Sequence, residues 1–207
     1  ELNPGYAYAH YWYAFQLMIM ARFDEASREI EQARELDPLS PIINREVGNI
    51  FLFARQYDKA IVASQKSLEM FPNLPYTHII IGNSYMAQSM YEKALGEYQK
   101  EKALLATWNP FIERFFGEAY ARTGRRAEAQ KILDEMLERS KQVYVPPTLF
   151  AIVYFALGEN DQGFTWLDKA YEDRDIWLLF FKVGPWYDTV RSDPRYTAML
   201  EKVGLDT

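Results

Sequence analysis

The residues that could carry chemistry are few in this chain, and they do not assemble into a recognisable catalytic set. The two histidines, His10 and His78, lie far apart, neither belongs to a His-Glu-x-x-His motif, and cysteine is absent. The tightest acidic cluster, Glu172, Asp173 and Asp175, supplies fewer oxygen ligands than a calcium site needs. We therefore expect no catalytic residues, no metal and no cofactor, and we interpret this cluster as a solvated turn.

The composition is that of an ordinary globular chain. It has 207 residues, of which 49% are hydrophobic and 25% charged, and its net charge is −6. An acidic chain lacks the clustered Lys and Arg that phosphate contacts require, so we expect no direct contact with nucleic acid. No apolar run is long enough to span a membrane, and we expect no membrane contact. The sequence does not fix the compartment, although we favour the cytoplasm.

Two stretches of the chain repeat each other closely. GNIFLFARQYDKA begins at Gly48, and GNSYMAQSMYEKA begins 34 residues later, at Gly82. Small residues continue this spacing of 34 or 35 in two series, Ala14, Gly48, Gly82, Gly117 and Ala151, and Ala26, Ala60, Ala94, Ala129 and Gly163. Such a period indicates repeats that bury their apolar faces against one another. We expect the small residues to mark the points where helices approach most closely.

Each repeat is predicted to be a hairpin of two helices. Apolar residues recur every three or four positions from Pro75 to Gln88, and again from Tyr91 to Leu105, with a short polar break between the two runs. Proline is favoured at the first position of a helix, where its missing N–H costs no hydrogen bond. We therefore expect the first helices of later repeats to open at Pro41, Pro75, Pro110 and Pro146 or Pro147.

These positions resemble the tetratricopeptide repeat (TPR) family. In the third repeat its pattern reads Ile81-Gly82, Tyr85, Ala94 and Tyr98. The resemblance implies an all-α, right-handed superhelical α-solenoid of about five TPR helical hairpins plus a C-terminal capping helix. The expected division is residues 1–5 as the end of a preceding repeat, repeats at 6–40, 41–74, 75–109, 110–143 and 144–175 within 6–175, and a capping segment at 176–207. Within that segment we expect a helix from Pro194 to Val203, ended by Gly204.

The C-terminal segment carries a second resemblance. The phrase RSDPRY, at Arg191–Tyr196, is similar to the C-terminal ends of bacterial TPR proteins whose repeats follow a winged-helix DNA-binding domain or a serine/threonine kinase domain. This similarity implies that the chain is the C-terminal part of a larger bacterial protein. It also implies an alternative function, in which the repeats form a ligand- or partner-sensing regulatory segment of a transcriptional regulator or kinase.

The TPR resemblance also predicts where a partner binds. In this family the first helix of each repeat lines a concave groove, and carrying those positions over gives a predicted partner-binding set of Tyr11, Phe15, Arg45, Asn49, Phe53, Tyr76, Asn83, Phe111 and Arg114. Asn49 and Asn83 hold the same position in adjacent repeats. Their amides could read the backbone of an extended peptide, or they could bridge neighbouring helices. Arg45 before Asn49 resembles part of a carboxylate clamp, but Ile80 stands where that clamp requires Asn.

We therefore predict a non-catalytic protein–protein interaction module that binds a protein or peptide segment in its concave groove. The aromatic residues among the predicted set would act as apolar anchors, as aromatics often do in binding sites. A small apolar ligand in the groove is an alternative, and so is self-association through the N-terminal end of the chain.

Overall fold

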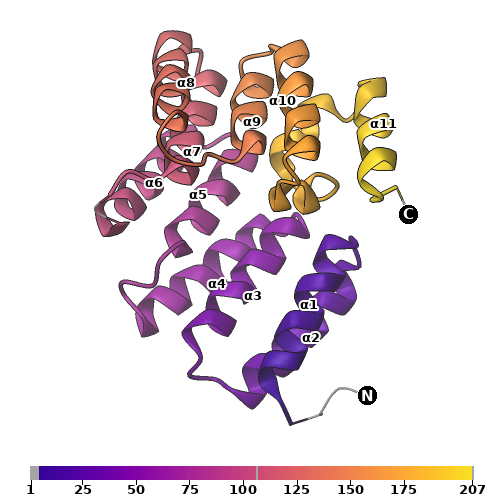
Figure 1. Ribbon diagram of the computed structural model, residues 1–207. Coiled ribbons are helices and arrows are strands. Elements are labelled where there is room, and N and C mark those ends of the chain that lie inside the picture. The colour runs from indigo at the N-terminus through magenta and orange to yellow at the C-terminus, as the bar shows by residue number, and fades with distance from the viewer. Residues whose placement is uncertain (1–4, 106, 207) are drawn as a thin grey trace. The chain divides into compact units, whose positions relative to one another are not determined.

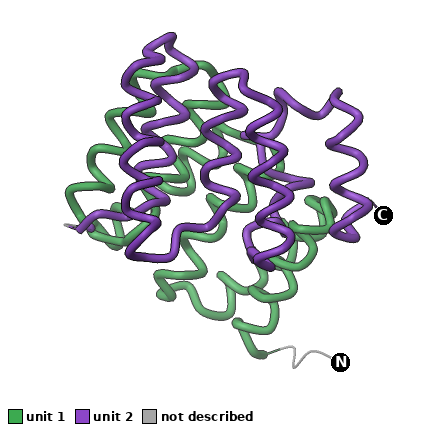
Figure 2. The backbone as a smooth tube through the Cα atoms, turned by 45° about the horizontal axis from the view of Figure 1, so that its top comes forward, with its two compact units in different colours: residues 1–104 green, residues 105–207 purple. Residues whose placement is uncertain are grey.

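The computed structural model describes residues 5–105 and 107–206, and over these residues the protein is helical and contains no strand. It divides into two compact units, residues 1–104 and 105–207, which are coloured separately in Figure 2. The prediction of an all-α solenoid is confirmed. None of the described helices is both long and apolar enough to cross a membrane.

Unit 1 consists of consecutive helical hairpins (Figure 1). Its helices are α1 (Ala7–Ile19), α2 (Phe23–Leu36), α3 (Pro41–Phe53), α4 (Tyr57–Met70), α5 (Thr77–Ala87) and α6 (Tyr91–Leu105), the last ending at the boundary with unit 2. α1 packs against α2 and α3 against α4, and α2 and α4 each contact the first helix of the next hairpin.

Unit 2 begins with two more hairpins and ends with a different structure. Its elements are α7 (Pro110–Arg122), α8 (Arg126–Ser140), α9 (Pro147–Ala156), α10 (Asn160–Glu172), the 3-10 helices η1 (Ile176–Phe180) and η2 (Pro185–Val190), and α11 (Pro194–Val203). The Asp193 side chain caps the start of α11, and Gly204 ends the helix in the left-handed conformation. The helix expected from Pro194 to Val203 is therefore confirmed.

The small residues of the repeat lie where helices approach most closely. A Cβ atom added to Gly82 of α5 would lie 2.3 Å from a ring carbon of Tyr98 of α6, a residue that is fully buried. Ala14, Ala26, Ala60 and Ala94 are fully buried as well. The interpretation of these positions as close contacts between helices is thus confirmed, since larger side chains would overpack the interior.

The turn inside every hairpin uses one residue in the left-handed region. Its φ values run from 60° to 77°, and the residues are Ala21, Arg55 and Ser89 in unit 1 and Gly124 and Gly158 in unit 2. Only glycine adopts this conformation without steric cost. The two units therefore build the same turn from different residues, and the turns of unit 1 carry the greater backbone strain.

The predicted starts of the first helices are mostly confirmed. α3 opens at Pro41, α7 at Pro110 and α9 at Pro147, as expected. The start predicted at Pro75 is wrong, because Tyr76 has φ 66° and α5 begins only at Thr77. A left-handed residue before the helix interrupts the helical path, so the proline lies outside it.

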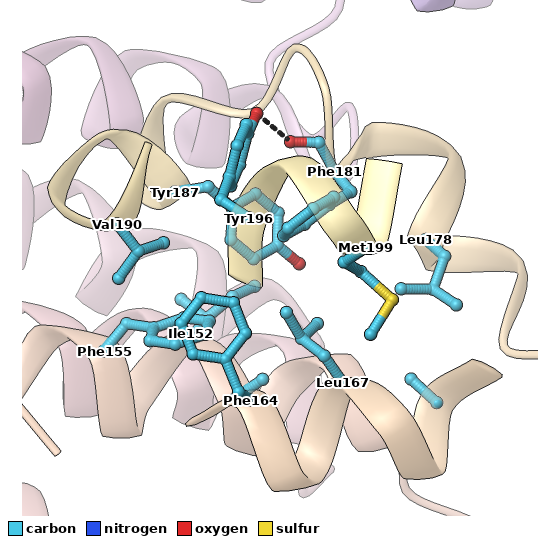
Figure 3. Close-up of a cluster of buried hydrophobic side chains, with 12 residues drawn as sticks. Ile152, Phe155, Phe164, Leu167, Leu178, Phe181, Tyr187, Val190, Tyr196 and Met199 are labelled. Atoms are coloured by element: carbon cyan, nitrogen blue, oxygen red, sulfur yellow. Dashed lines mark hydrogen bonds between the residues drawn. The ribbon is translucent and has the colours of Figure 1, made fainter. Parts of the chain in front are cut away.

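The segment after α10 closes the end of unit 2. Buried side chains of this segment and of α11 pack against α9 and α10 in one hydrophobic cluster, as Figure 3 shows. The cluster contains Leu178, Phe181, Tyr187 and Val190 of the segment, Tyr196 and Met199 of α11, Ile152 and Phe155 of α9, and Phe164 and Leu167 of α10. The Tyr196 hydroxyl donates a hydrogen bond of 3.1 Å to the carbonyl of Phe181. This segment is therefore an integral part of the core of unit 2.

Candidate functional site

Two of the predicted binding residues of unit 1, Arg45 and Asn49, meet around one buried carboxylate. Glu46 of α3 is 6% exposed. Its Oε1 accepts from Arg45, with 2.9 Å to Nε and 2.8 Å to Nη2, and its Oε2 accepts from Nδ2 of Asn49 at 2.9 Å. A third donor of Arg45, Nη1, is directed at the carbonyl of Pro75, 3.4 Å away. Glu46 thus holds the guanidinium and the amide in fixed positions.

Aromatic side chains on α1 form a series of ring contacts, and one of them, Tyr11, interacts electrostatically with Glu46. Tyr8 and Tyr11 meet edge to face with ring centroids 6.1 Å apart, Tyr11 and Trp12 are 4.8 Å apart, and Trp12 and Phe15 are 6.0 Å apart. Trp12 is 57% exposed, whereas Tyr8 and Phe15 are half-buried. We call Tyr8, Tyr11, Trp12 and Phe15 of α1, together with Ile42, Arg45 and Asn49 of α3, the α1–α3 face.

Tyr11 connects the two halves of this face. Burial, reinforced by the negative charge of Glu46, raises the pKa of Tyr11 to about 12, while Arg45 acts in the opposite direction. α1 and α3 are in contact, and the charged pair on α3 acts on this phenol. Tyr11 is 9% exposed and stays neutral at physiological pH.

Asn49 and Asn83, which share a repeat position, have different hydrogen-bond partners. Asn49 is partly exposed and is held by Glu46 on the same helix. Asn83 is 8% exposed, and its Oδ1 accepts a 2.8 Å hydrogen bond from the hydroxyl of Tyr98 on α6. Of the two interpretations that the sequence left open, Asn83 follows the bridging one. Asn49 alone remains a candidate for reading a peptide backbone.

Tyr76 and Phe53 lie at opposite extremes of exposure. Tyr76 is 43% exposed, and its backbone N–H donates to Oε1 of Glu101 at 2.6 Å. Glu101 is fully buried, and its burial raises the pKa of the carboxyl above its ordinary value, although the hydrogen bond from Tyr76 opposes the shift. Phe53 is only 3% exposed and belongs to the core rather than to an open groove.

In unit 2 the chain's own C-terminal segment covers the predicted binding residues. The ring of Trp177 of η1 lies 4.7 Å from that of Phe111. Arg114 is 3% exposed, with its guanidinium carbon 3.7 Å from the ring centroid of Phe115 and 4.9 Å from that of Trp186 of η2. The expectation of an open groove at these two positions is therefore wrong, because residues of η1 and η2 already occupy the space.

The buried charges of unit 2 pair with one another. Glu118 accepts from Nη1 of Arg114 at 2.8 Å and from Nε of Arg122 at 3.1 Å. A carboxylate between two guanidiniums offsets part of the cost of removing these charges from water. This network belongs to the interior, and it supports the packing of Arg114 against the aromatic rings.

The two histidines have structural partners. Nδ1 of His10 lies 2.6 Å from Glu29, and Nδ1 of His78 lies 2.6 Å from Glu97, so each histidine joins the two helices of its own hairpin. Among the described residues, no group of three or more His, Asp or Glu is arranged to hold a metal ion.

Asp175 corrects the interpretation of the acidic cluster as a solvated turn. It is 4% exposed, and its Oδ2 accepts from the backbone N–H of Thr148 at 3.1 Å and from the Thr148 hydroxyl at 2.8 Å. Its Oδ1 accepts from the N–H of Trp177 at 3.0 Å. The side chain thus caps α9 and η1 together, which a local reading of the sequence could not reveal.

Sequence reasoning also missed the two residues that organise unit 1. Glu46 and Glu101 lie outside the groove positions of the family, so the resemblance gave them no role. The only available signal for Glu46 was its place directly after Arg45. For Glu101, nothing in the sequence indicates that it reaches the start of a helix 25 residues earlier.

Comparisons with known proteins support the fold. No protein-family model and no curated protein matches the sequence. Similar solved structures include the following three. One is the APC/C hetero-tetramer Cut9–Hcn1 (TM-score 0.67, 15% identity, 97% of this chain and 43% of that one). Another is a thermophilic TPR protein of Thermus thermophilus (TM-score 0.66, 18% identity, 94% of this chain and 99% of that one). The third is a tetratricopeptide repeat protein of Parabacteroides merdae (TM-score 0.53, 16% identity, 97% of this chain and 80% of that one). The chain thus spans less than half the length of the first, and it has the tetratricopeptide-repeat fold.

Proposed function

We propose that the protein is a non-catalytic interaction module that binds a peptide or partner segment on the α1–α3 face of unit 1. The observation that carries this proposal is the combination, on one face, of an exposed Trp12 with Arg45 and Asn49, which Glu46 holds in place. Exposed aromatics beside fixed polar groups are typical of binding hot spots. One of the similar structures belongs to a hetero-tetramer, which agrees with a role in assembly.

Polar groups that are already fixed bind a partner at a lower entropic cost. Arg45 and Asn49 donate to the same carboxylate, so neither side chain must be ordered when a partner arrives. The exposed Trp12 adds a large apolar side chain on α1, where its ring lies 4.8 Å from that of Tyr11. The face can therefore contribute both affinity and orientation, which is what recognition of a short segment requires.

The test is partner capture by the full chain and by two matched double variants. Arg45→Ala with Asn49→Ala removes the polar groups of the face, whereas Lys66→Ala with Gln65→Ala changes an exposed amine and amide on α4. We expect the Lys66→Ala, Gln65→Ala variant to bind a partner with the affinity of the wild type. The Arg45→Ala, Asn49→Ala variant should bind it with an affinity at least about ten-fold lower, since each lost charged hydrogen bond costs about 1.5–3 kcal/mol.

Quantitative mass spectrometry of the captured proteins, followed by calorimetry on the partner, provides the measurement. Circular dichroism of both variants checks that the helices remain. If every captured protein binds the two variants equally well, the α1–α3 face is not the binding site and the proposal is wrong.

A further inference from the structure

Unit 2 shows how an aromatic side chain is accommodated at the position that Arg45 holds in unit 1. Arg45 and Arg114 are both the fifth residue of the first helix of their repeats, as carried over from the family pattern. In unit 2 the guanidinium of Arg114 contacts the rings of both Phe115 and Trp186. The chain itself thus contains one case in which a segment packs a tryptophan ring against the arginine at this repeat position.

The segment that supplies Trp186 is short and has a defined shape. Gly184 and Pro185 lead into η2, and the carbonyl of Gly184 accepts from the N–H of Tyr187 at 3.2 Å. A Cβ atom on Gly184 would lie 2.8 Å from the Trp186 indole, so the turn keeps the ring against the preceding backbone. The result is a compact Gly-Pro-Trp turn that presents one flat aromatic face.

Arg45 is prepared for the same contact but is not covered in this way. Its Nε and Nη2 donate to Glu46 and its Nη1 to the carbonyl of Pro75, so three of its five N–H groups are engaged and hold the guanidinium in one orientation. The side chain nevertheless remains 21% exposed. A guanidinium that is held at its edge by such partners can still stack its flat face on an aromatic ring.

The charge of Glu46 argues against a carboxylate as the group recognised here. A second carboxylate on Arg45 would lie close to this buried acid, and the two negative charges would repel each other. An uncharged ring avoids that cost. Beside Arg45, Ile42 is 39% exposed and holds the repeat position of Phe111, which packs against Trp177 in unit 2. The α1–α3 face thus offers a second apolar contact next to the first.

We infer that the α1–α3 face binds a partner segment that lays a tryptophan side chain on the guanidinium of Arg45, as Trp186 lies on Arg114. This inference rests on the proposed function and specifies the partner as a compact aromatic turn of the Gly-Pro-Trp kind. The segment comes from another protein, because η1 and η2 of this chain are committed to the core of unit 2.

The probe is a fluorescein-labelled peptide with the sequence of residues 183–189, Val-Gly-Pro-Trp-Tyr-Asp-Thr. Its binding to the full chain is followed by fluorescence anisotropy, beside the same peptide with Trp186→Ala. We expect saturable binding of the first peptide and about ten-fold weaker binding of the second, which reflects the loss of a partly desolvated cation–π contact.

Variants of the chain identify where the peptide binds. Arg45→Lys keeps the charge but loses the planar group, and Arg45→Ala removes both. We expect each variant to bind the tryptophan peptide with about ten-fold lower affinity and to bind the alanine peptide with unchanged affinity. Lys59→Ala on α4 is the control and should bind both peptides like the wild type. Circular dichroism confirms that each variant is folded.

Four results would overturn the inference. They are the absence of saturable binding, equal binding of the two peptides, unaltered binding by both Arg45 variants, and a dimer of the full chain that Arg45→Ala dissociates while the peptide does not bind. The last result would assign the face to a second copy. A captured partner that needs Arg45 and Asn49 but binds without an aromatic side chain would leave the proposed function standing and remove only this inference.

Discussion

The two units present the same helical framework and treat one surface of it differently. In unit 1 the α1–α3 face leaves Ile42 39% exposed and the side chain of Arg45 21% exposed. In unit 2 the residues at the matching positions, Phe111 and Arg114, are covered by the rings of Trp177 and Trp186. A repeat position therefore defines where a side chain lies on its helix, and the rest of the chain decides whether a partner can reach it.

The largest expected effect comes from separating the covering segment from unit 2. Asp175→Ala removes the acceptor of the Thr148 N–H and hydroxyl and of the Trp177 N–H, which are buried or nearly so. We expect a loss of about 3 kcal/mol in the free energy of unfolding, since hydrogen bonds to a buried charge contribute about 1.5–3 kcal/mol. Hydrogen exchange should show faster exchange across residues 176–190.

Asp173→Ala is the control, because Asp173 is exposed two residues earlier in the same turn. It should change neither the unfolding transition nor the exchange. If Asp175→Ala leaves residues 176–190 as well protected as in the wild type, then Asp175 does not hold the segment over unit 2, and the contrast between the units has another origin.

A second prediction compares a close contact between helices in each unit. A Cβ at Gly82 would lie 2.3 Å from the ring of Tyr98, whereas at Gly117 the nearest atom is 3.1 Å away, in Val153. We expect Gly82→Ala to destabilise the protein by about 2 kcal/mol through overpacking. Gly117→Ala should be nearly neutral, since a small clash offsets the gain in helix propensity.

Urea denaturation measures both variants. Gly96→Ala is the control, because an added Cβ there meets no atom within 4 Å and should stabilise α6 slightly. Equal losses for Gly82→Ala and Gly117→Ala would show that Tyr98 moves aside easily. Its full burial and its hydrogen bond to Asn83 would then not fix it in place.

The smallest expected effect concerns the turns inside the hairpins. Ala21→Gly relieves a left-handed residue in unit 1, and we expect it to stabilise the protein by up to about 1 kcal/mol. Gly124→Ala imposes the same strain on unit 2 and should cost about 1 kcal/mol. Thermal melts of the two variants should therefore shift in opposite directions, and a shift in the same direction would refute the strain assigned to unit 1.

The repeating part of the fold was predictable because it depends on periodic, local features. Small residues at a fixed interval predicted the contacts between helices, and the sequence around Pro194 contained both ends of α11. The start of α5 was missed because it depends on Glu101, whose carboxylate reaches Tyr76 only after the hairpin has folded. Local patterns carry no record of a capping group that arrives from another helix.

The candidate site was predictable in position but not in exposure. The family pattern correctly placed Arg45 and Asn49 on one side of α3, where Glu46 joins them. It could not show that η1 and η2 bury Arg114, or that Asn83 is engaged by Tyr98. Whether a residue on a helix face stays open depends on contacts between distant segments, and a single sequence does not display these.

The cover over unit 2 also constrains how the sequence can change over time. Arg114 contacts Trp186 and Phe111 contacts Trp177, so a change in one member of a pair alters the packing of the other. Relatives of this protein should therefore covary at these paired positions. For the α1–α3 face, in contrast, the proposed function predicts that substitutions follow changes in the partner protein.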